Sequence, residues 1–373
     1  MDFAFSEEQE MLRASAREFL GAHYPVERVA ELADGEPGWD PASWRQLADL
    51  GWIGLSVPAE RGGAGGSLVD EAVLFEEAGR ALYPGPWFAT VGLALPALEA
   101  ADPESGSGVL AVVLDGERSA TLAFAEEGGP LRLADAGMAA CKAREESDGW
   151  RLDGAKFLVP DLTLVDDALV VARAGFGVGI WQVDLRADRS PVRARSTMDS
   201  TRRLGDLVLD ATPATLLAGP DQAEPLLAST HLRALAALAC EAVGVASRAL
   251  AFATEQARSR HQFGRPIGSF QAVSHRIADA YMATELARSL AYWAAWTTAE
   301  SDPQAPSACA AAKAAAGEAA TLAAETAIQC LGGLGFTWDH PLHRFYKRAQ
   351  WIATFDGTAR THRADLATTL LDP

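Results

Sequence analysis

The sequence predicts an α+β fold in which a helical segment, a β segment and a second helical segment follow one another. Apolar residues recur at helical spacing over residues 1–108, alternate in short runs over 109–215, and return to helical spacing over 216–373. A chain of 373 residues is too long for one small core and favours two or three domains. We therefore expect an N-terminal helical domain, a central β domain and a C-terminal helical bundle with these bounds.

The first segment carries local helix and turn signals. Ser6 precedes acidic residues and can cap a helix, in which Met11, Leu12, Ala16 and Phe19 share one face. A second helix is expected over 44–50 and a third over 68–82. The glycine-rich run RGGAGG at 61–66 lacks the spacing of a phosphate-binding loop, so we interpret it as a turn that needs positive φ.

The second segment has the period of β-strands. Short alternating runs are separated by Gly, Pro and Asp at intervals of about ten residues, which favours a small antiparallel barrel or sandwich. The expected strands are Val109–Leu114, Thr121–Ala125, Trp150–Leu152, Ala168–Ala172, Val178–Leu185 and Asp206–Leu209.

The third segment predicts long helices, as in a four-helix bundle. One helix is expected over 226–260, with a break near its start left open, and Ser269 can cap the next one, which ends before Asp302. In that second helix Phe270, Val273, Ile277 and Tyr281 form an apolar face. An alanine-rich helix over 307–331 ends at Gly332-Gly333.

Composition narrows the class of protein. Fifty acidic residues against 32 basic ones give a formal charge of −18 without a polybasic run, which argues against nucleic-acid and membrane partners. The N-terminus has no basic and apolar export signal, and no uninterrupted apolar run reaches the ~18 residues of a membrane span. The four cysteines lack CxxC spacing, which indicates buried thiols in a reducing cytoplasm.

Four sequence motifs resemble those of the acyl-CoA dehydrogenase family. LADLGWIGLSVP at 47–58 is similar to part of its N-terminal domain, and RSRHQFGRPIGSFQ at 258–271 resembles its RxQFGxPIxxFQ signature. QCLGGLGF at 329–336 resembles its QxxGGxG signature, and FDGT at 355–358 lies where the family has YEGT. The four motifs occur in the family's order along the whole chain, which makes the resemblance specific.

The resemblance implies an FAD-dependent enzyme that desaturates a fatty or steroid acyl-CoA thioester. In that chemistry a carboxylate removes the α-proton, the β-hydride goes to the flavin, and an electron-transfer flavoprotein takes the electrons. In the family, the C-terminal motifs contact the ADP end of a flavin that is held mainly by the neighbouring subunit.

The cofactor-binding residues implied by the resemblance lie in these C-terminal motifs. Arg260 can neutralise the pyrophosphate, Phe263 can pack beside the adenosine, and Gln329 precedes a bare backbone that permits close approach. The alternative is that the polar residues are solvated helix ends and that the glycines only end a helix. The full set is Arg260, Gln262, Phe263, Gln271, Gln329, Gly332, Gly333 and Thr358.

Two segments that form the family's flavin-head pocket depart from its pattern. Where the family has TEPxAGS, this chain has AEEGGP at 125–130, which lacks the threonine and the serine. Where the family has KxWI followed by Thr or Ser, this chain has KFLVP at 156–160. Leu158 cannot stack on the flavin as an aromatic residue would, and Pro160 has neither a hydroxyl nor a backbone N–H. Buried flavin atoms without partners would cost roughly 1–3 kcal/mol each.

The catalytic base is also altered. Asp356 occupies the position of the family's commonest catalytic glutamate, and its shorter side chain reaches about 1.5 Å less far, which can reduce rate strongly. The alternative is a turn residue, because Asp-Gly is a common turn pair. Some family members carry the base on the preceding helix, at a position that corresponds here to about Ala234, and Glu241 is a reserve candidate two turns further on.

A metal site is not expected. His340 and His343 have a loosely metal-like spacing, but the sequence offers no third ligand, and Pro341 between them is typical of a helix start.

Three hypotheses remain at this point. In the first, the chain is the half-site subunit of an α2β2 acyl-CoA dehydrogenase of the steroid-degrading branch, and a paralogous subunit supplies the base and the flavin-head pocket. In the second, it is a self-sufficient homotetramer that uses Asp356. In the third, it is a flavin-free acyl-CoA-binding or scaffold protein with the same fold.

Overall fold

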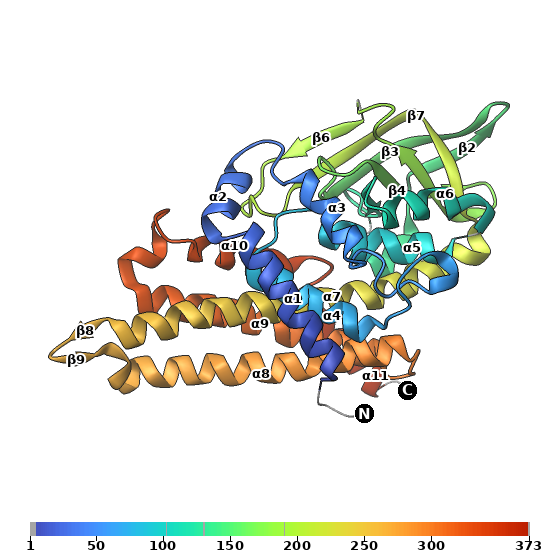
Figure 1. Ribbon diagram of the computed structural model, residues 1–373. Coiled ribbons are helices and arrows are strands. Elements are labelled where there is room, and N and C mark those ends of the chain that lie inside the picture. Colours follow the sequence, from blue (N-terminus) through green and yellow to red (C-terminus); the bar gives the residue numbers. More distant parts are fainter. Residues whose placement is uncertain (1–4, 102, 130, 190, 372–373) are drawn as a thin grey trace. The chain divides into compact units, whose positions relative to one another are not determined.

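The computed structural model describes residues 5–371 except 102, 130 and 190 (Figure 1). The chain forms two compact units. The helical unit comprises Met1–Asp34, Leu68–Tyr83 and Leu235–Pro373, and the β unit comprises Gly35–Ser67 and Pro84–Ala234. The division into three domains at 108 and 215 stays a prediction.

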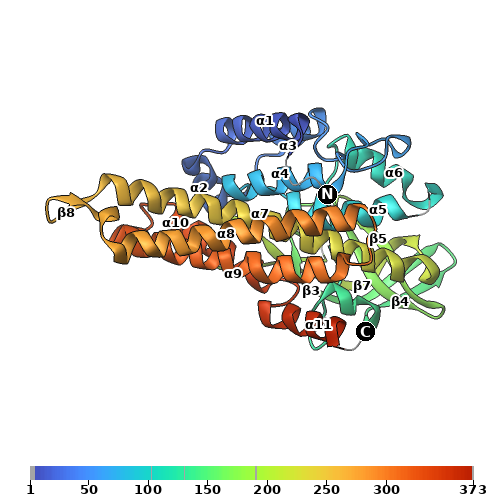
Figure 2. The same cartoon turned by 90° about the horizontal axis from the view of Figure 1, so that it is seen from below.

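The helical unit consists of α1 (Glu7–His23), α2 (Val26–Asp34), α4 (Leu68–Ala81), α8 (Gln271–Ala299), α9 (Ala305–Leu331), α10 (Leu342–Thr354), α11 (Ala359–Leu371) and the part of α7 (Pro220–Ser259) that follows Ala234. A short hairpin of β8 (His261–Gln262) and β9 (Arg265–Pro266) and the 3-10 turns Ile267–Ser269 and Gly332–Phe336 connect them. The long helices α7, α8 and α9 run side by side (Figure 2).

Local signals set several helix ends as the sequence predicts. Ser6 caps α1 in a reciprocal capping box, because its hydroxyl accepts from the Gln9 amide at 3.2 Å and its own amide donates to the Gln9 side chain at 3.1 Å. The turn before α4 has positive φ at Gly62 and Gly65. Helix α9 ends at Gly332, whose φ of +64° favours glycine.

Helices α4 and α7 pack with their backbones in direct contact. A Cβ atom on Gly244 of α7 would overlap the carbonyl oxygen of Glu76 of α4, and a Cβ on Gly79 would overlap the carbonyl oxygen of Glu241. The two glycines therefore face each other's helix and allow a separation that no larger residue permits.

The close α4–α7 contact buries carboxylates that need charged partners. Glu76 accepts from the Tyr292 hydroxyl at 2.8 Å and pairs with Arg288, both on α8. Glu77 accepts two hydrogen bonds from Arg17 of α1, at 2.6 and 3.1 Å. These ion pairs tie α1, α4 and α8 together, and losing one partner would leave an uncompensated buried charge.

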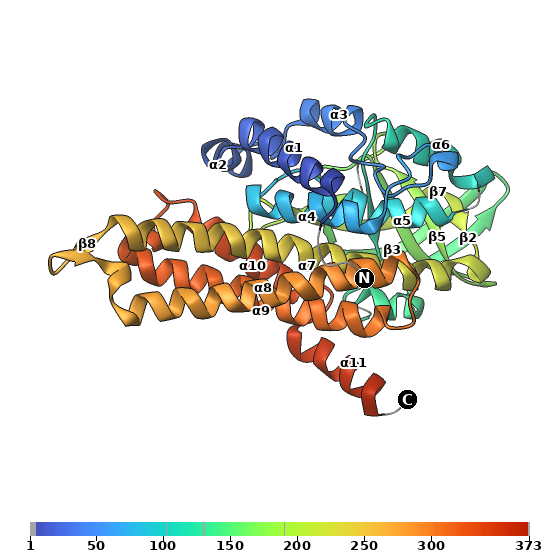
Figure 3. The ribbon, with the colours of Figure 1, turned by 60° about the horizontal axis from the view of Figure 1, so that its bottom comes forward.

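The large apolar residues of α8 do not fill the core of the helical unit. Its buried positions are occupied mainly by small residues: Ala280, Thr284, Ala287, Ala291, Ala294, Ala295 and Thr297. Tyr281, Met282 and Leu286 are 57%, 56% and 68% exposed. Figure 3 shows α8 beside α9, which supplies a matching alanine-rich face. The exposed stripe on α8 is therefore available to another surface.

The β unit is a closed barrel, as the sequence analysis allows. The strands follow the order β1-β4-β2-β3-β7-β5, β5 pairs back to β4, and β6 pairs with β7. Most pairs are antiparallel, and β1 and β2 are parallel to β4. The strands are β1 (Ala120–Ala123), β2 (Lys142–Glu146), β3 (Gly149–Pro160), β4 (Asp167–Ala174), β5 (Gly177–Asp184), β6 (Val192–Arg195) and β7 (Leu204–Ala218). Their inward residues form one apolar core around Trp181.

The β unit also contains short helical elements. They are α3 (Pro41–Asp49), the 3-10 turns Ala59–Arg61 and Leu133–Met138, the π-helix Phe88–Ala94, α5 (Leu95–Ala100) and α6 (Pro103–Leu114). The predicted strand Val109–Leu114 is wrong, because this run belongs to α6. The buried residues of this run, Leu110 and Val113, are three positions apart, which is the spacing of one helix face.

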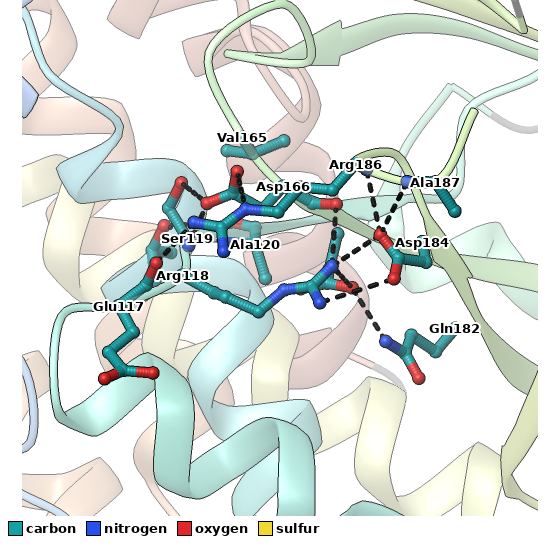
Figure 4. Close-up of polar contacts among 12 residues, drawn as sticks. Glu117, Arg118, Ser119, Ala120, Val165, Asp166, Gln182, Asp184, Arg186 and Ala187 are labelled. Carbon is teal, nitrogen blue, oxygen red and sulfur yellow. Dashed lines mark hydrogen bonds and ion pairs between the residues drawn. The ribbon is translucent and has the colours of Figure 1, made fainter. Parts of the chain in front are cut away.

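An ionic cluster joins the entry of β1 to β4 and β5 (Figure 4). Arg118 lies 2.7 Å from Asp167 and 2.6 Å from Asp184, and Gln182 donates to Asp167 at 2.7 Å. Burial raises the pKa of Asp167, although Gln182 and Arg118 oppose that rise. Burial also opposes ionisation of Asp184, but hydrogen bonds from Arg118 and from backbone amides outweigh it and lower its pKa. The cluster therefore links the segment before β1 to the start of β4 and the end of β5.

The structure also shows the start of α8, the cysteines and the course of α7. Ser269 does not cap α8, because its hydroxyl donates to the Pro266 carbonyl at 2.7 Å. All four cysteines are buried and none forms a disulfide bond, as expected. Helix α7 is continuous through Pro225. Its length and composition would suffice to cross a membrane, but 78% of its most apolar window is buried inside the protein, which is typical of a core helix.

We predict that Gly244→Ala lowers the free energy of unfolding by about 1–3 kcal/mol or more, because the added methyl group forces α4 away from α7. Gly21→Ala in α1 is the matched control, since a Cβ there meets nothing within 4 Å. This control should raise the free energy of unfolding by about 0.5–1 kcal/mol, because alanine has a higher helix propensity than glycine. Chemical denaturation of both variants measures the difference, and equal effects would contradict the close packing.

Candidate functional site

The predicted nucleotide motif at 258–271 forms the connection between α7 and α8. Gln262 pairs with Arg265 across the β8–β9 hairpin, and the turn between them has positive φ at Phe263 (+52°) and Gly264 (+79°). The Phe263 ring is 92% exposed, and it contacts Phe270 edge-to-face with ring centroids 6.1 Å apart. The hairpin therefore presents an aromatic side chain outward.

Three polar side chains of this motif are not engaged by the described part of the chain. Arg260, Gln262 and Gln271 are exposed, and none of the three makes a side-chain hydrogen bond or ion pair to the part of the chain that the structure describes. Arg265 differs, because its guanidinium stacks over the Phe270 ring at 4.1 Å. Three hydrogen-bonding side chains therefore remain available to a ligand at this end of the unit.

The second motif lies where α9 ends. Gln329, Gly332 and Gly333 are all exposed. The conformation of Gly332 requires glycine, but a Cβ on Gly333 would meet nothing within 4 Å. Nothing that the structure describes thus explains why residue 333 lacks a side chain.

The two motifs lie at the same end of the helical unit. Helices α8 and α9 pack together and are joined by the short connection 300–304, so they run antiparallel. The start of α8 therefore lies beside the end of α9. Electrostatic interaction between Arg276 and Cys330 agrees with this arrangement.

Asp356 is part of a tight turn between α10 and α11. Its φ is +57° and that of Gly357 is +110°, and the Gly357 amide donates to the Thr354 carbonyl at 3.3 Å. The turn interpretation is therefore correct for the backbone. The side chain is nevertheless only 5% exposed, which is unusual for a turn aspartate. Thr358 is exposed and shares a hydrogen bond with Thr361.

Lys313 of α9 adds a buried cation close to this turn. It is 2% exposed, and its ammonium group donates to the Gly357 carbonyl at 3.3 Å. The sequence gives no signal for this residue, because it lies inside the alanine-rich helix.

The alternative base positions on α7 carry no free carboxylate. Ala234 is buried and has no ionisable group. Glu241 is 2% exposed and forms an ion pair with Arg348 of α10 at 2.5 Å, where Arg348 is itself 1% exposed. This buried pair accounts for Glu241 as a structural residue.

The two barrel segments that correspond to the flavin-head pocket lie against each other. The Phe157 amide donates to the Ala125 carbonyl at 2.8 Å. The Lys156 ammonium donates to the Glu126 carboxylate at 2.5 Å and to the Phe124 carbonyl at 3.2 Å. Pro130, the last residue of the first segment, lies outside the described residues.

Glu126 is the acceptor on which this contact depends. Burial alone would raise the pKa of its carboxyl, but the hydrogen bond from Lys156 and backbone donors at Cys141 and Ala140 outweigh burial and lower that pKa. The carboxylate therefore stays ionised beside a fully buried Lys156.

The donors of the second segment are largely consumed within the barrel. The Leu158 amide donates to Asp206 at 3.1 Å, and Asp206 also binds Arg195 at 2.6 Å. Arg195 lies over the Phe157 ring at 4.3 Å. Pro160 has no amide hydrogen and contributes its carbonyl to Thr121 at 2.8 Å.

The chain's residues thus fit one end of an FAD better than the other. Exposed, unengaged donors at Arg260, Gln262 and Gln329 suit a pyrophosphate and a nucleotide. The segment at 156–160 offers a flavin ring neither a hydroxyl nor an uncommitted amide at Phe157 or Leu158.

The histidine pair does not form a metal site within the described residues. No group of three or more His, Cys, Asp or Glu side chains there could hold a metal ion. Pro341 precedes α10, as predicted, and His340 accepts from the Leu342 amide at 3.1 Å. Burial and neighbouring cations lower the pKa of His343 to about 4.

Two family models match the chain. Residues 6–117 match the acyl-CoA dehydrogenase N-terminal domain, and residues 230–371 match the acyl-CoA dehydrogenase C-terminal domain. Acyl-CoA dehydrogenase IpdE2 of Mycobacterium tuberculosis is 34% identical over 352 residues, which cover 93% of this chain and 92% of that protein.

Solved structures give the same result. A variant of the Tcur3481–Tcur3483 steroid ACAD superposes with a TM-score of 0.86 at 33% identity, covering 98% of both chains. The ChsE4–ChsE5 complex of Mycobacterium tuberculosis contains a chain with a TM-score of 0.88 at 28% identity, covering 100% of both chains.

The fold and the matched motifs define a flavoprotein oxidoreductase that acts on CH–CH bonds. The chain belongs to the acyl-CoA dehydrogenase family, with the helical, barrel and helical order of that family.

We predict that Lys156→Met destabilises the chain by about 3–5 kcal/mol, because it leaves the Glu126 carboxylate buried without its cation. The double variant Lys156→Met, Glu126→Gln should recover part of that loss, since Gln keeps an acceptor for the backbone donors and removes the charge. Denaturant unfolding at pH 7 compares them.

The same pair gives a pH signature. The folded pKa of Glu126 is lowered, so its contribution to stability is complete above its unfolded pKa and is lost as pH falls through the folded value. Stability should therefore decline less on acidification in the double variant than in the wild type. Identical pH profiles would contradict an ionised Glu126.

Proposed function

We propose that this chain is the half-site subunit of a heteromeric FAD-dependent acyl-CoA dehydrogenase. In an α2β2 assembly it would complete, through Arg260, Gln262, Phe263, Gln271, Gln329, Gly332, Gly333 and Thr358, the FAD site of a catalytic paralogue. The observation that carries the proposal is the asymmetry between the two ends of the expected FAD site. Donors at the nucleotide end are exposed and uncommitted, whereas those of the flavin-head segments are absent or already used.

The nucleotide end supports a role in binding another subunit's cofactor. Arg260 carries a positive charge without a counter-ion among the described residues, and a pyrophosphate would supply one. The open backbone at Gly333 permits close approach by a nucleotide, although no part of the described chain comes near it. Phe263, 92% exposed, can cover an adenine ring.

The barrel supports the complementary half of the proposal. A flavin ring presents several polar atoms, and each one buried without a partner costs roughly 1–3 kcal/mol. Leu158 and Pro160 offer no hydroxyl, and the Leu158 amide is committed to Asp206. A flavin whose head lay in this barrel would therefore be held weakly.

Exposed apolar residues support association with further subunits. Tyr281, Met282 and Leu286 form the stripe on α8, and Phe336 and Trp338 beyond α9 are 77% and 69% exposed. Exposed large apolar side chains of this kind are typical of a protein–protein interface.

The relatives support the substrate class and the heteromeric assembly. One similar structure is described as a steroid ACAD and another as a ChsE4–ChsE5 complex. We therefore favour a steroid-type acyl-CoA thioester as substrate, an electron-transfer flavoprotein as acceptor and the cytoplasm as location, without nucleic-acid or membrane partners. FAD, when bound, accepts the hydride from the thioester β-carbon.

A second candidate function is a self-sufficient homotetramer that uses Asp356. One observation favours it: the Asp356 side chain is 5% exposed, and buried carboxylates are common among catalytic bases. A flavin-free scaffold is less favoured, because it has no need of an uncommitted Arg260.

We predict that the chain purified alone retains little FAD, whereas its complex with a paralogous subunit retains about one FAD per two chains. In that complex Arg260→Ala should lose FAD, because it removes a charge-assisted contact worth roughly 1.5–3 kcal/mol. The flavin-to-protein absorbance ratio of gel-filtered samples measures retention.

Arg258→Ala is the matched control. It removes the same charge two residues earlier from another exposed position and should leave FAD content unchanged. A yellow, stoichiometric homo-oligomer of this chain alone would contradict the half-site proposal. Unchanged FAD in the Arg260 variant would contradict only the assignment of the nucleotide end.

We also predict that Asp356→Asn in the complex leaves dye-coupled desaturation within a few-fold of the wild type, because the paralogue supplies the base. Loss of a true general base typically costs 10²–10⁴-fold. A loss of about 10³-fold with FAD still bound would identify Asp356 as the base and favour the homotetramer. Flavin absorbance is recorded on the same samples.

A further inference from the structure

A cavity of about 410 Å³ lies within the helical unit. The ends of α1 and α4, the start of α2 and the middle of α7 surround it. Its volume falls in the range of small-molecule sites, roughly 300–1,000 Å³. It shares no residue with the motifs at 258–271, 329–336 or 355–358.

Three arginines line this cavity, and they differ in what they bind. Arg17 is satisfied, because its guanidinium donates twice to Glu77. Arg80 and Arg248 have no such partner: neither guanidinium makes a hydrogen bond or ion pair to any residue that the structure describes. Arg248 only stacks over the Phe252 ring at 4.6 Å.

The surroundings of Arg80 are electrostatically unfavourable for a cation. Burial lowers the pKa of Arg80, and the positive charges of Arg17 and Arg248 lower it further, with Glu77 and Glu76 opposing them. The guanidinium remains charged at neutral pH. A half-buried cation among like charges is stabilised when an anion enters beside it.

Apart from the three arginines and the carboxylates of Glu77 and Glu27, the lining is apolar or glycine, and it indicates what else the occupant carries. Leu20, Tyr24, Pro25 and Val26 are among the lining residues. Glu27 also lines it but is exposed, so it would repel a second anionic group at the mouth. An occupant with a single anionic head and a small uncharged apolar body suits this lining.

We propose that this cavity binds a small organic phosphate monoester, whose phosphate is held by Arg80 and Arg248 and whose apolar body packs against Tyr24 and Val26. Two uncompensated guanidinium groups match a phosphate monoester, which carries about −1.5 to −2 charges at pH 7. A carboxylate would neutralise only one of them. Arginine also matches phosphate geometry, because its planar fork donates two parallel hydrogen bonds.

This proposal is independent of the proposed function. It concerns binding rather than turnover, so a failure of the half-site assignment would leave it intact, and its own failure would not affect FAD binding.

Titration calorimetry on the purified full-length chain tests the site. Phenyl phosphate, benzoate and inorganic phosphate are titrated at equal ionic strength set with chloride. Phenyl phosphate should bind once per copy of this chain and at least tenfold more tightly than benzoate. Arg80→Gln and Arg248→Gln should each weaken it at least tenfold, the effect of losing a charge-assisted hydrogen bond.

Arg28→Gln is the matched control. Arg28 lies on α2, pairs with Glu31 on the surface and does not line the cavity, so its loss should leave phenyl phosphate affinity unchanged. Arg80→Lys keeps the positive charge but loses the planar guanidinium donors, so its affinity for phenyl phosphate should lie between those of the wild type and Arg80→Gln. Thermal unfolding verifies that each variant is folded.

A second readout needs no variant. Phenylglyoxal modifies accessible guanidinium groups, and phenyl phosphate should slow modification of Arg80 at least fivefold in the wild-type chain, as followed by peptide mass spectrometry. The proposal is overturned if phenyl phosphate neither binds nor protects Arg80, or if both Gln variants bind it like wild type. The proposal is also overturned if Arg80 is modified slowly without phenyl phosphate in a protein that binds none. A side chain of an associated subunit would then occupy the cavity.

Discussion

The close contact between α4 and α7 is the constraint on which the helical unit depends. Because Gly79 and Gly244 let the two backbones meet, the carboxylates of Glu76 and Glu241 are enclosed and require cations. Those cations come from elsewhere in the unit, Arg288 from α8 and Arg348 from α10. The absence of side chains at these two glycines thus allows the close contact that buries the carboxylates. The buried carboxylates in turn need the ion pairs that hold the helices together.

The residues expected at the two ends of the FAD differ in whether their polar groups are already used within the chain. In the barrel, the Lys156–Glu126 pair and the Arg118 cluster satisfy buried charges within the unit, and the Leu158 amide is committed to Asp206. At the end of α7, Arg260 and Gln262 are left without partners among the described residues. Groups already satisfied internally give a ligand little to bind, whereas exposed and uncommitted donors can contribute their full interaction. This difference is the physical basis for assigning the chain a half-site.

Several other features of the helical unit are unsatisfied within a single chain. The stripe of Tyr281, Met282 and Leu286 on α8 exposes apolar area, and Arg80 lacks a counter-ion in its cavity. The first feature favours another protein surface, because its area is apolar and convex on a helix. The second favours a small ligand, because its charge lies in a concave site.

The sequence by itself determined the features that depend on neighbours along the chain. The capping box at Ser6, the glycine turn before α4 and the end of α9 at Gly332 are local, and the motif at 258–271, with Arg260, Gln262 and Phe263, resembles the family's signature by residue type. Only the tertiary structure decided what depends on distant partners. Val109–Leu114 was predicted to be a strand and is part of helix α6, because a short apolar run suits both conformations and its buried residues lie three apart, on one helix face.

Other features also depend on contacts between residues that are far apart in the sequence. Glu241 became a structural residue because Arg348 lies beside it from 107 positions away, and the charged strands β2 and β6 gained their conformation from pairing rather than from an apolar period. Asp356 combined a turn backbone with a buried side chain, which no local pattern distinguishes from an exposed Asp-Gly turn. Burial and partner choice are properties of the folded chain, since they arise from contacts between residues that the sequence separates.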